Sequence, residues 1–170
     1  MAIDDSGTIV RPNPFFEKTT KELAKYIAND DPEIVKKAKF LAFYKGKPVI
    51  KIDKICDWFY GGKAQASSFG VIFIDSDRKD FINDLNHEYG HTKQFDLLGP
   101  VYYTIGVAIP SLHDYFTIRN DSSRYYNEPQ EITADLLGEV SRSSHTKSAI
   151  KEGWDYLNKL ILNKLGIGKL

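Results

Sequence analysis

The sequence predicts a compact α+β fold that is mostly helical and contains a small sheet. Most of the chain carries apolar residues three and four positions apart, as amphipathic helices do. Only two short runs, residues 47–52 and 69–75, are rich in the Val, Ile and Phe that favour β-strands. A chain of 170 residues is long enough for a core of its own. We therefore expect one domain at residues 15–170, after a linker or tail at residues 1–14.

Two helices are expected before the first strand. Apolar residues recur at helical spacing over residues 16–28. A second helix begins at Asp31-Pro32-Glu33, where an N-cap residue, a proline at the first helical position and an acid in the first turn follow one another. We expect it to continue to Phe40. The lysine-rich sides of both helices are interpreted as solvent-facing surface.

The two strand-like runs come next, and the segment between them is punctuated by turn residues. Lys47–Ile52 and residues 69–75 are the predicted strands. Gly61-Gly62 and Ser67-Ser68 mark the connection, because glycine and serine favour turns and loops. The sheet is therefore expected to be small.

The helix after the second strand carries the most informative motif of the chain. Residues 87–91 read His-Glu-Tyr-Gly-His, which matches H-E-x-x-H. The flanking residues 81–95 keep helical spacing, and Asp77 or Asp80 could cap the start of the helix. Residues four apart on a helix lie one above the other. The two histidines can therefore direct their imidazoles to one point.

This spacing predicts a zinc site. Imidazole is a common zinc ligand, and catalytic zinc typically has three protein ligands and one open position. Glu88 follows His87 directly and lies alongside the stacked histidines, where it can take a proton from a water molecule at the metal. Gly90 is a weak helix former, but its missing side chain lets another segment approach closely.

The third ligand is expected further along the chain. The extended pattern H-E-x-x-H-x-x-G-x-x-H is excluded, because Gln94 and Leu97 stand where it needs glycine and histidine. Its methionine turn is missing as well, since the only methionine is Met1. Asp96 lies at the wrong helical angle to join the two histidines.

A pair of acids provides the better candidate. Glu131 and Asp135 are four residues apart on a segment that reads as a helix from Pro129 onward. H-E-x-x-H followed by E-x-x-x-D resembles the gluzincins, the thermolysin-like branch of the zincin metallopeptidases. The resemblance implies that Glu131 is the third zinc ligand and that Asp135 accepts a hydrogen bond from a zinc histidine, His87 in our assignment.

The same resemblance implies a zincin-like arrangement, in which the small sheet lies beside the H-E-x-x-H helix. In that family an exposed edge strand holds the substrate as an additional strand, and residues 69–74 are the corresponding run here. An ordinary core strand is an equally good interpretation of this run. Ala134, between the two acids, is small enough to let the two helices pack closely.

Glu128 is the alternative third ligand. Pro129 follows it directly, and the position one turn further on holds Ile132 rather than a carboxylate. A second carboxylate to orient a histidine would then be missing, so we favour Glu131.

The remaining elements are less distinctive. Val101–Ile109 is too short to cross a bilayer, and its glycine and flanking prolines indicate a buried hairpin or irregular segment under the zinc helix. Residues 150–165 read as an amphipathic helix that closes the core. Six side chains could donate to the oxyanion of a tetrahedral intermediate. They are His113, His145, Tyr102, Tyr103, Tyr125 and Tyr126.

A narrower resemblance covers roughly residues 69–140. HEYGHTKQ, then LGPVYYTIGVAIPSL and a later glutamate before Ala-Asp, are similar to a group of small bacterial H-E-x-x-H proteins. Similar domains occur as C-terminal toxin modules of Rhs-type polymorphic toxins. The resemblance implies a bacterial effector with a larger carrier polypeptide and a cognate inhibitor as partners.

Composition excludes several other functions. Lys+Arg and Asp+Glu number 23 each, so no basic excess indicates nucleic acid, and no basic amphipathic stretch indicates a membrane. No run reaches the roughly 18 apolar residues of a membrane span. The single Cys56 excludes an intrachain disulfide framework. Residues 1–16 lack the features of a signal peptide, so we expect a cytoplasmic protein or one exported within a larger polypeptide.

We therefore expect a zinc metallopeptidase that hydrolyses a peptide or protein substrate. His87, His91 and Glu131 would hold the zinc, and Glu88 would act as general base. Two alternatives stay open. The chain could be a non-catalytic binding module whose motif is incidental or holds structural zinc, or a zinc amidase that acts on a non-protein amide.

Overall fold

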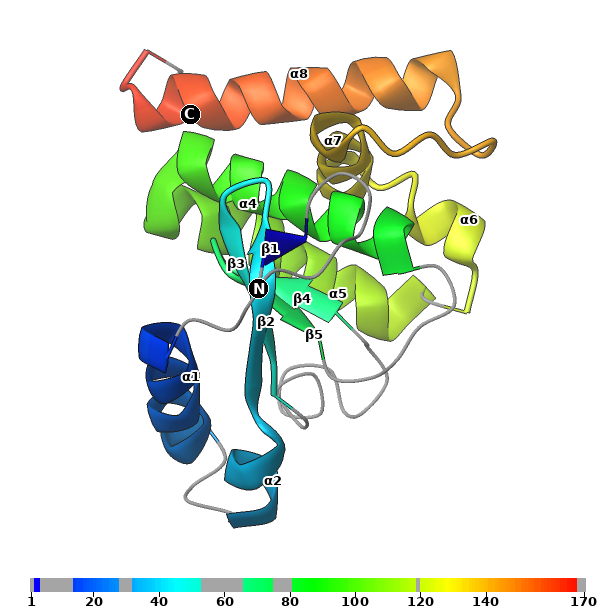
Figure 1. Cartoon of the computed structure of the whole chain (residues 1–170). Helices are drawn as coiled ribbons and strands as arrows, with labels where there is room; N and C mark the ends of the chain where they lie inside the picture. Colours follow the sequence, from blue (N-terminus) through cyan, green and yellow to red (C-terminus); the bar gives the residue numbers. More distant parts are fainter. Residues whose placement is uncertain are drawn as a thin grey trace. The chain divides into compact units, whose positions relative to one another are not determined.

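The computed structural model describes residues 2–3, 14–27, 32–52, 66–74, 81–118 and 120–167. Helices predominate and are accompanied by a small sheet, so the predicted α+β class is confirmed (Figure 1). The chain divides into two compact units, residues 1–89 and 90–170, and the division falls inside helix α4 (Phe81–Tyr103). Of the predicted linker or tail at residues 1–14, residues 1 and 4–13 lie outside the described residues, as do Cys56, Gly61-Gly62 and the predicted caps Asp77 and Asp80.

The first unit is built on a five-stranded mixed sheet with the strand order β1-β2-β3-β5-β4. The hairpin β2–β3 turns at Lys45 and Gly46, and Gly46 has a φ of 80° that glycine adopts without strain. β5 runs parallel to β3 and antiparallel to β4. The strands are β1 (Ala2–Ile3), β2 (Lys39–Tyr44), β3 (Lys47–Lys51), β4 (Ala66–Ser68) and β5 (Ile72–Ile74).

This topology corrects one prediction about the sheet. β5 lies between β3 and β4, and all three of its residues are buried. Of the two predicted alternatives for residues 69–74, the exposed edge is therefore wrong for β5 and the ordinary core strand is confirmed. Among the described strands, β4 and β1 are at the edges. β1 also brings Ala2 and Ile3 into the sheet beside Phe43 and Tyr44.

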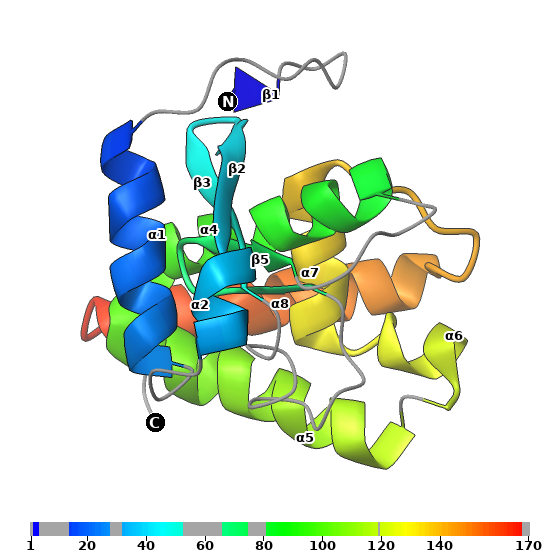
Figure 2. The ribbon, with the colours of Figure 1, turned by 60° about the horizontal axis from the view of Figure 1, so that its bottom comes forward.

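Two helices precede the hairpin, α1 (Pro14–Ile27) and α2 (Pro32–Lys37). α1 packs against α2 and β2, and it lies beside the hairpin in Figure 2. α2 ends at Lys37 rather than at the predicted Phe40, because residues 39–44 join the sheet as β2. Lys21 of α1 donates to the carbonyl oxygens of Val35 and Lys36 at 2.8 and 2.6 Å. This contact satisfies carbonyl groups near the end of α2.

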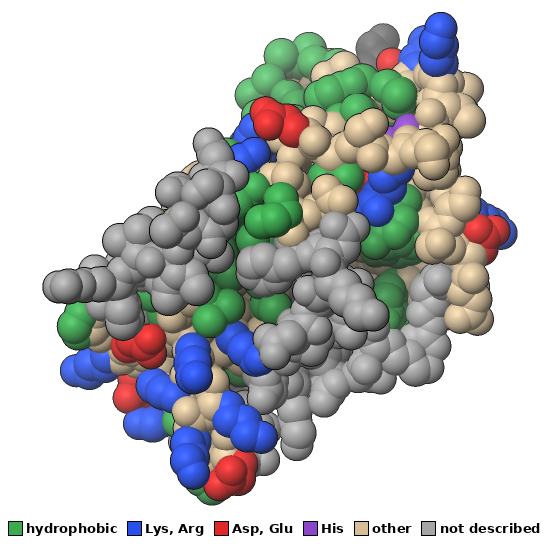
Figure 3. Space-filling model, turned by 45° about the vertical axis from the view of Figure 1, so that its right-hand side comes forward, with side chains coloured by type: hydrophobic (Ala, Val, Ile, Leu, Met, Phe, Trp, Pro, Cys, Tyr) green, Lys and Arg blue, Asp and Glu red, His purple; other side chains and the backbone are tan. Residues whose placement is uncertain are grey.

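Exposed charges on these helices agree with the predicted solvent-facing sides. On the face that Figure 3 draws, Lys and Arg side chains lie at the surface together with acidic side chains. The exposed lysines of α1 and α2 are Lys18, Lys25, Lys36 and Lys37.

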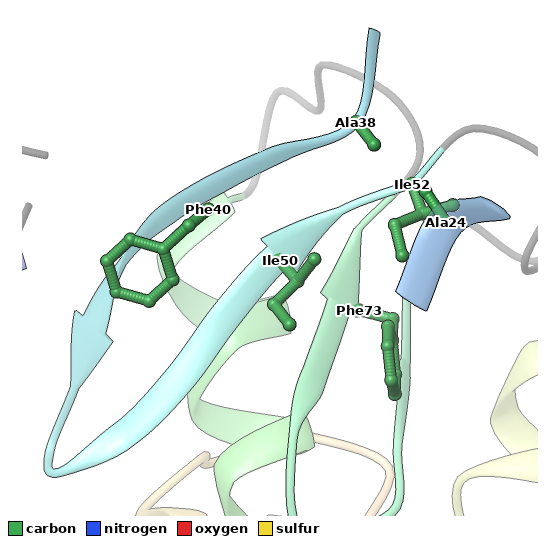
Figure 4. Packing of buried hydrophobic residues seen from close by; sticks show 6 residues of the cluster. All are labelled: Ala24, Ala38, Phe40, Ile50, Ile52 and Phe73. Atoms are coloured by element: carbon green, nitrogen blue, oxygen red, sulfur yellow. The ribbon is translucent and has the colours of Figure 1, made fainter. Parts of the chain in front are cut away.

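The sheet has an apolar cluster on each face. β3 and β5 contribute alternate residues to the two clusters, as the period of two of a strand requires. α1 covers one face through Ala24, and the start of α4 covers the other through Leu85. The first cluster consists of Ala24, Ala38, Phe40, Ile50, Ile52 and Phe73 (Figure 4). The second consists of Tyr44, Val49, Ile72, Ile74 and Leu85.

A β-bulge lets β2 contribute to both clusters. Its pairing with β3 shifts register just after Phe40. Phe40 and Phe43, three residues apart, therefore make an edge-to-face ring contact with centroids 5.3 Å apart. Tyr44 faces the other cluster, where its hydroxyl donates to Oδ1 of Asn86, the residue before His87. The helical turn that begins the motif is thus attached to the sheet.

Residues 101–109, which follow the H-E-x-x-H motif, are helical. α4 is kinked at Gly99, which has a φ of 70°, and Pro100 follows at the kink. The chain continues through a π-helical turn, η1 (Thr104–Ala108), into α5 (Ile109–Ile118). The prediction of a buried hairpin or irregular segment at residues 101–109 is therefore wrong. The glycine inside this run serves packing instead, because a Cβ at Gly106 would lie 2.7 Å from the Leu160 side chain.

Several large apolar side chains of this helical run are exposed, namely Val101, Ile105, Ile109 and Phe116. By length and composition alone, the helical run Ile82–Ile118 is long and apolar enough to cross a membrane. The prediction that no run reaches roughly 18 apolar residues therefore does not exclude a membrane-spanning helix by this criterion. Core helices of soluble proteins, which are mostly buried, meet the same criteria of length and composition.

Three further helices complete the second unit. α7 packs against α8 and lies below it in the view of Figure 1. Gly153 of α8 permits this contact, since a Cβ there would lie 2.2 Å from Cγ2 of Ile132. α8 begins at the N-cap Thr146, whose side chain accepts from the backbone N–H of Ala149, and it confirms the predicted final helix. The three helices are α6 (Ser122–Tyr125), α7 (Pro129–Gly138) and α8 (Lys147–Lys164).

Candidate metal centre

The H-E-x-x-H motif lies in the helical part of α4 before its kink. His87, Glu88 and His91 are all buried, each with 7% of its surface exposed. Two nearby polar residues of α4, Thr92 and Gln94, are fully buried as well. Such a buried group of polar side chains is expensive unless its members bind one another or a ligand. The three motif side chains therefore face the protein interior and not the solvent.

Helix α7 carries Glu131, the predicted third ligand. Glu128 is the N-cap residue and Pro129 occupies the first turn, which is where proline is tolerated. The buried side of α7 runs from Gln130 to Asp135, and Glu131 is fully buried within it. A carboxylate in the first turn is also favoured by the helix dipole.

The structure brings His87, His91 and Glu131 together. One potential ligand atom from each of the three side chains lies within 4.8 Å of those of the other two. Nε2 of His91 and Oε2 of Glu131 are 3.4 Å apart. Two ligand atoms of a tetrahedral zinc ion with bonds of about 2.1 Å are about 3.4 Å apart, so this pair fits such an ion. The group could therefore hold a metal ion.

A close contact between α4 and α7 brings His91 and Glu131 together. A Cβ atom at Gly90 would lie 1.8 Å from the carbonyl oxygen of Ala134. No side chain fits there, so the two backbones touch, as the sequence predicts for Gly90 and Ala134. Because Gly90 and His91 are adjacent, this contact sets how near α7 can come to the site.

Glu128, the alternative ligand, is not part of the group of potential ligands among the described residues. It is partly exposed, and burial raises the pKa of its carboxyl above the usual 4.5. The neighbouring Asp114 carboxylate raises this pKa further, whereas Arg124 lowers it. Asp114 itself accepts a hydrogen bond of 2.7 Å from Nε2 of Gln130.

Asp135 lies in a buried charged cluster one turn beyond Glu131. Its carboxylate accepts two hydrogen bonds from Arg142, at 2.5 Å from Nε and 3.2 Å from the terminal nitrogen. Nε2 of His145 lies 3.2 Å from the same carboxylate. The Arg142 guanidinium stacks on the ring of Tyr126, 3.6 Å from its centroid. The role of Asp135 as a partner of His87 stays a prediction.

The other predicted oxyanion donors have different surroundings. His113 is exposed on α5 beside Asp114, and Tyr102 donates to the carbonyl oxygen of Asn163 at 3.2 Å. Tyr103 is buried in an edge-to-face contact with Phe95. The hydroxyl of Tyr125 lies 3.2 Å from Oγ of Ser111. Tyr126 supports Arg142, and the side chain of His145 is almost fully buried.

Sequence reasoning missed two residues of this region, Gln94 and Arg142. Oε1 of Gln94 lies 2.7 Å from Nδ1 of His91. A signal for Gln94 existed, because residues three apart on a helix are neighbours. No such signal existed for Arg142, which reaches Asp135 from the segment after α7.

Comparisons with protein-family models, with curated proteins and with solved structures give no match. The function is therefore argued from the site itself. Its chemistry is that of two imidazoles and one carboxylate that could hold a metal ion, with a buried glutamate next to the first imidazole.

Proposed function

We propose that the chain is a zinc-dependent hydrolase that cleaves an amide bond, most plainly a peptide bond. The observation behind this proposal is the group formed by His87, His91 and Glu131. Two nitrogens and one oxygen form a ligand set that suits zinc. Structural zinc sites normally have four protein ligands, whereas catalytic sites have three and keep one position open. The three ligands among the described residues therefore favour catalysis.

Glu88 supplies the acid–base chemistry in this proposal. When bound, zinc would polarise the carbonyl group of the substrate and lower the pKa of a water molecule to about 7. Glu88 takes a proton from the attacking water and then delivers it to the leaving nitrogen. Glu88 is buried and directly follows His87, so its carboxylate is shielded from bulk solvent next to a ligand residue. Asp135 orients a liganding histidine in the gluzincin pattern, and this role is part of the proposal.

The metal part of the proposal is tested by elemental analysis after purification without added zinc. We expect one zinc per chain in the wild type and in Glu128→Ala, and a loss of zinc in Glu131→Ala. Glu128 is the matched control, because it is an acid at the start of the same helix. Zinc that is absent from the wild type even after supplementation would refute the metal site and favour a non-catalytic binding module.

The catalytic part needs a separate test. Cleavage of a mixture of unstructured peptides is followed by mass spectrometry for the wild type and for Glu88→Gln. We expect Glu88→Gln to keep its zinc and to lose cleavage by at least about 100-fold. Equal cleavage by the two proteins would remove Glu88 from the mechanism. Zinc without cleavage of any peptide would favour a non-protein amide or a structural zinc.

The resemblance to toxin modules adds a biological proposal, in which the chain is an effector carried by a larger polypeptide and neutralised by a cognate inhibitor. The support is the run HEYGHTKQ and the glycine- and proline-flanked segment after it. Expression in a bacterial host is then expected to slow growth, and Glu88→Gln is expected to restore it. A wild type without effect on growth would count against the toxin assignment and leave the hydrolase unaffected.

A further inference from the structure

The side chain of Gln94 connects the candidate metal centre to helix α7. Gln94 lies on α4 three residues after His91 and is fully buried. Its amide makes three contacts of 2.7 Å: Oε1 with Nδ1 of His91, and Nε2 with the carbonyl oxygen of Gln130 and with Oγ1 of Thr133. All the hydrogen-bonding groups of a glutamine side chain are thereby used in one place.

The orientation of the Gln94 amide follows from its partners. The backbone carbonyl of Gln130 can only accept, so the amide nitrogen of Gln94 must face it. Thr133 has two carbonyl acceptors for its hydroxyl hydrogen, Pro129 at 2.9 Å and Gln130 at 3.2 Å, and offers a lone pair to the same amide nitrogen. A reversed amide would place two acceptors against each other. The oxygen of Gln94 therefore faces His91.

The tautomer of His91 follows from this orientation. The oxygen of an amide only accepts, so Nδ1 of His91 must carry the proton and donate it to Gln94. In a neutral imidazole, Nε2 then holds the free lone pair that a metal ligand needs. Nε2 is also the nitrogen that faces Oε2 of Glu131, at 3.4 Å. The direction of each hydrogen bond is therefore determined, from Gln130 and Thr133 at the start of α7, through the Gln94 amide, to the His91 ring.

We propose that Gln94 is a positioning residue for the metal centre: it sets the tautomer and ring orientation of His91, and it couples that ring to the helix that carries Glu131. The inference rests on the proposed metal site. Without an acceptor at Nδ1, either nitrogen of the imidazole can carry the proton, and the form protonated at Nε2 cannot bind the metal there. Gln94 therefore raises metal affinity without touching the metal.

The first test uses metal-free protein and reads the tautomer directly. Long-range nitrogen–proton correlation spectra distinguish a protonated from an unprotonated ring nitrogen. We expect His91 in the wild type to be protonated at Nδ1, and we expect Gln94→Met to populate the form protonated at Nε2. Gln94→Glu, in its protonated form, keeps an acceptor oxygen at His91 and a hydroxyl donor toward the Gln130 carbonyl, and it should keep the wild-type tautomer. A His91 tautomer that is the same in the wild type and Gln94→Met would overturn the inference.

The second test measures zinc affinity by competition with a chromophoric chelator. We expect Gln94→Met to bind zinc about 10- to 100-fold more weakly than the wild type. Tyr156→Phe is the control for stability, because it also removes a hydrogen bond between helices, from the Tyr156 hydroxyl to the carbonyl oxygen of Gly106 at 2.7 Å. Its zinc affinity should be unchanged. An affinity of Gln94→Met equal to that of the wild type would contradict the proposal.

The two tests separate this inference from the proposed function. If the wild type binds no zinc, the proposed hydrolase fails, while the tautomer of His91 in metal-free protein still decides the role of Gln94. If the wild type binds zinc and Gln94→Met binds it equally well, the metal centre stands and the positioning role falls. Circular dichroism and urea unfolding show whether Gln94→Met folds, and Gln94→Leu provides a second variant of similar size without an acceptor for His91.

Discussion

At the scale of single residues, the charged cluster around Asp135 is the clearest case of a buried group that depends on its partner. Asp135 is fully buried, and Arg142 donates two hydrogen bonds to it. Removal of one partner from a buried ion pair leaves an uncompensated charge and costs about 3 kcal/mol or more. We expect Arg142→Met to lower the free energy of unfolding by about 3 kcal/mol in urea titrations. Arg124→Met, which removes an exposed arginine of α6, should change it by less than about 0.5 kcal/mol.

The raised pKa of Glu128 predicts a dependence of stability on pH. Because the carboxyl has a higher pKa in the folded protein than the usual 4.5, the folded state binds the proton more tightly than the unfolded state. This residue's contribution to stability is therefore fully present below pH 4.5 and is lost as the pH rises through the folded-state pKa. In metal-free protein, Glu128→Gln should be more stable than the wild type at pH 7, by less than about 1 kcal/mol. Equal stabilities at pH 7 would contradict this expectation.

Single-residue roles differ in how far the sequence can predict them. The spacing of His87 and His91 follows from one helix, and Glu131 follows from the E-x-x-x-D pattern on a second helix. Helical periodicity also places Gln94 beside His91, although nothing in the sequence alone shows that its amide points there. Arg142 could not be predicted as a partner of Asp135, because it lies after the end of α7, where no periodicity specifies direction.

At the scale of elements, the crossing of α4 and α7 controls the site. A Cβ at Gly90 would lie 1.8 Å from a backbone oxygen of Ala134, and a backbone cannot move aside as a side chain can. Gly90→Ala should therefore force the helices apart, lower the free energy of unfolding by about 3 kcal/mol or more, and weaken zinc binding.

Gly106→Ala is the matched control for this prediction. Its added Cβ would meet only the end of the Leu160 side chain, at 2.7 Å, and this side chain can rotate. We expect a smaller loss of stability and unchanged zinc affinity. Urea unfolding and chelator competition measure both quantities. Equal losses in the two variants would show that the contact between backbones has no special role.

Elements also show where sequence patterns fail. α1 and α8 have regular apolar spacing and were predictable from it. β2 was not predictable in this way. The bulge after Phe40 interrupts the alternation of side chains between the two faces, which is the pattern that identifies a strand. For residues 101–109, glycine and proline suggest an irregular segment, but the run is helical. Gly99 and Pro100 form a kink before it, and Gly106 allows close packing against Leu160. Tertiary contacts decided these positions.

At the scale of the whole molecule, zinc binding should appear as stability. A ligand that binds only the folded state stabilises it by about 2.7 kcal/mol at a free concentration 100 times its Kd. For a protein of this size that corresponds to a rise in Tm of roughly 5–10 °C. The rise should vanish in Glu131→Gln, which keeps the shape of the side chain but weakens its charge-based ligation. It should persist in Glu128→Gln, whose substitution lies outside the ligand group.

Thermal unfolding tests whether Glu131 or Glu128 is the third ligand, and it needs no substrate. Thermal unfolding is recorded with zinc and with excess chelator for the wild type and the two glutamine variants. If Glu131→Gln gains as much stability from zinc as the wild type, the metal binds elsewhere, and the three-ligand centre is excluded. If only Glu128→Gln loses the gain, the alternative ligand is correct, and the buried position of Glu131 needs another explanation. If the zinc-dependent rise in Tm is lost in Glu131→Gln and kept in Glu128→Gln, Glu131 is the ligand. The burial of Glu131 and the close crossing of α4 and α7 at Gly90 then both contribute to zinc binding.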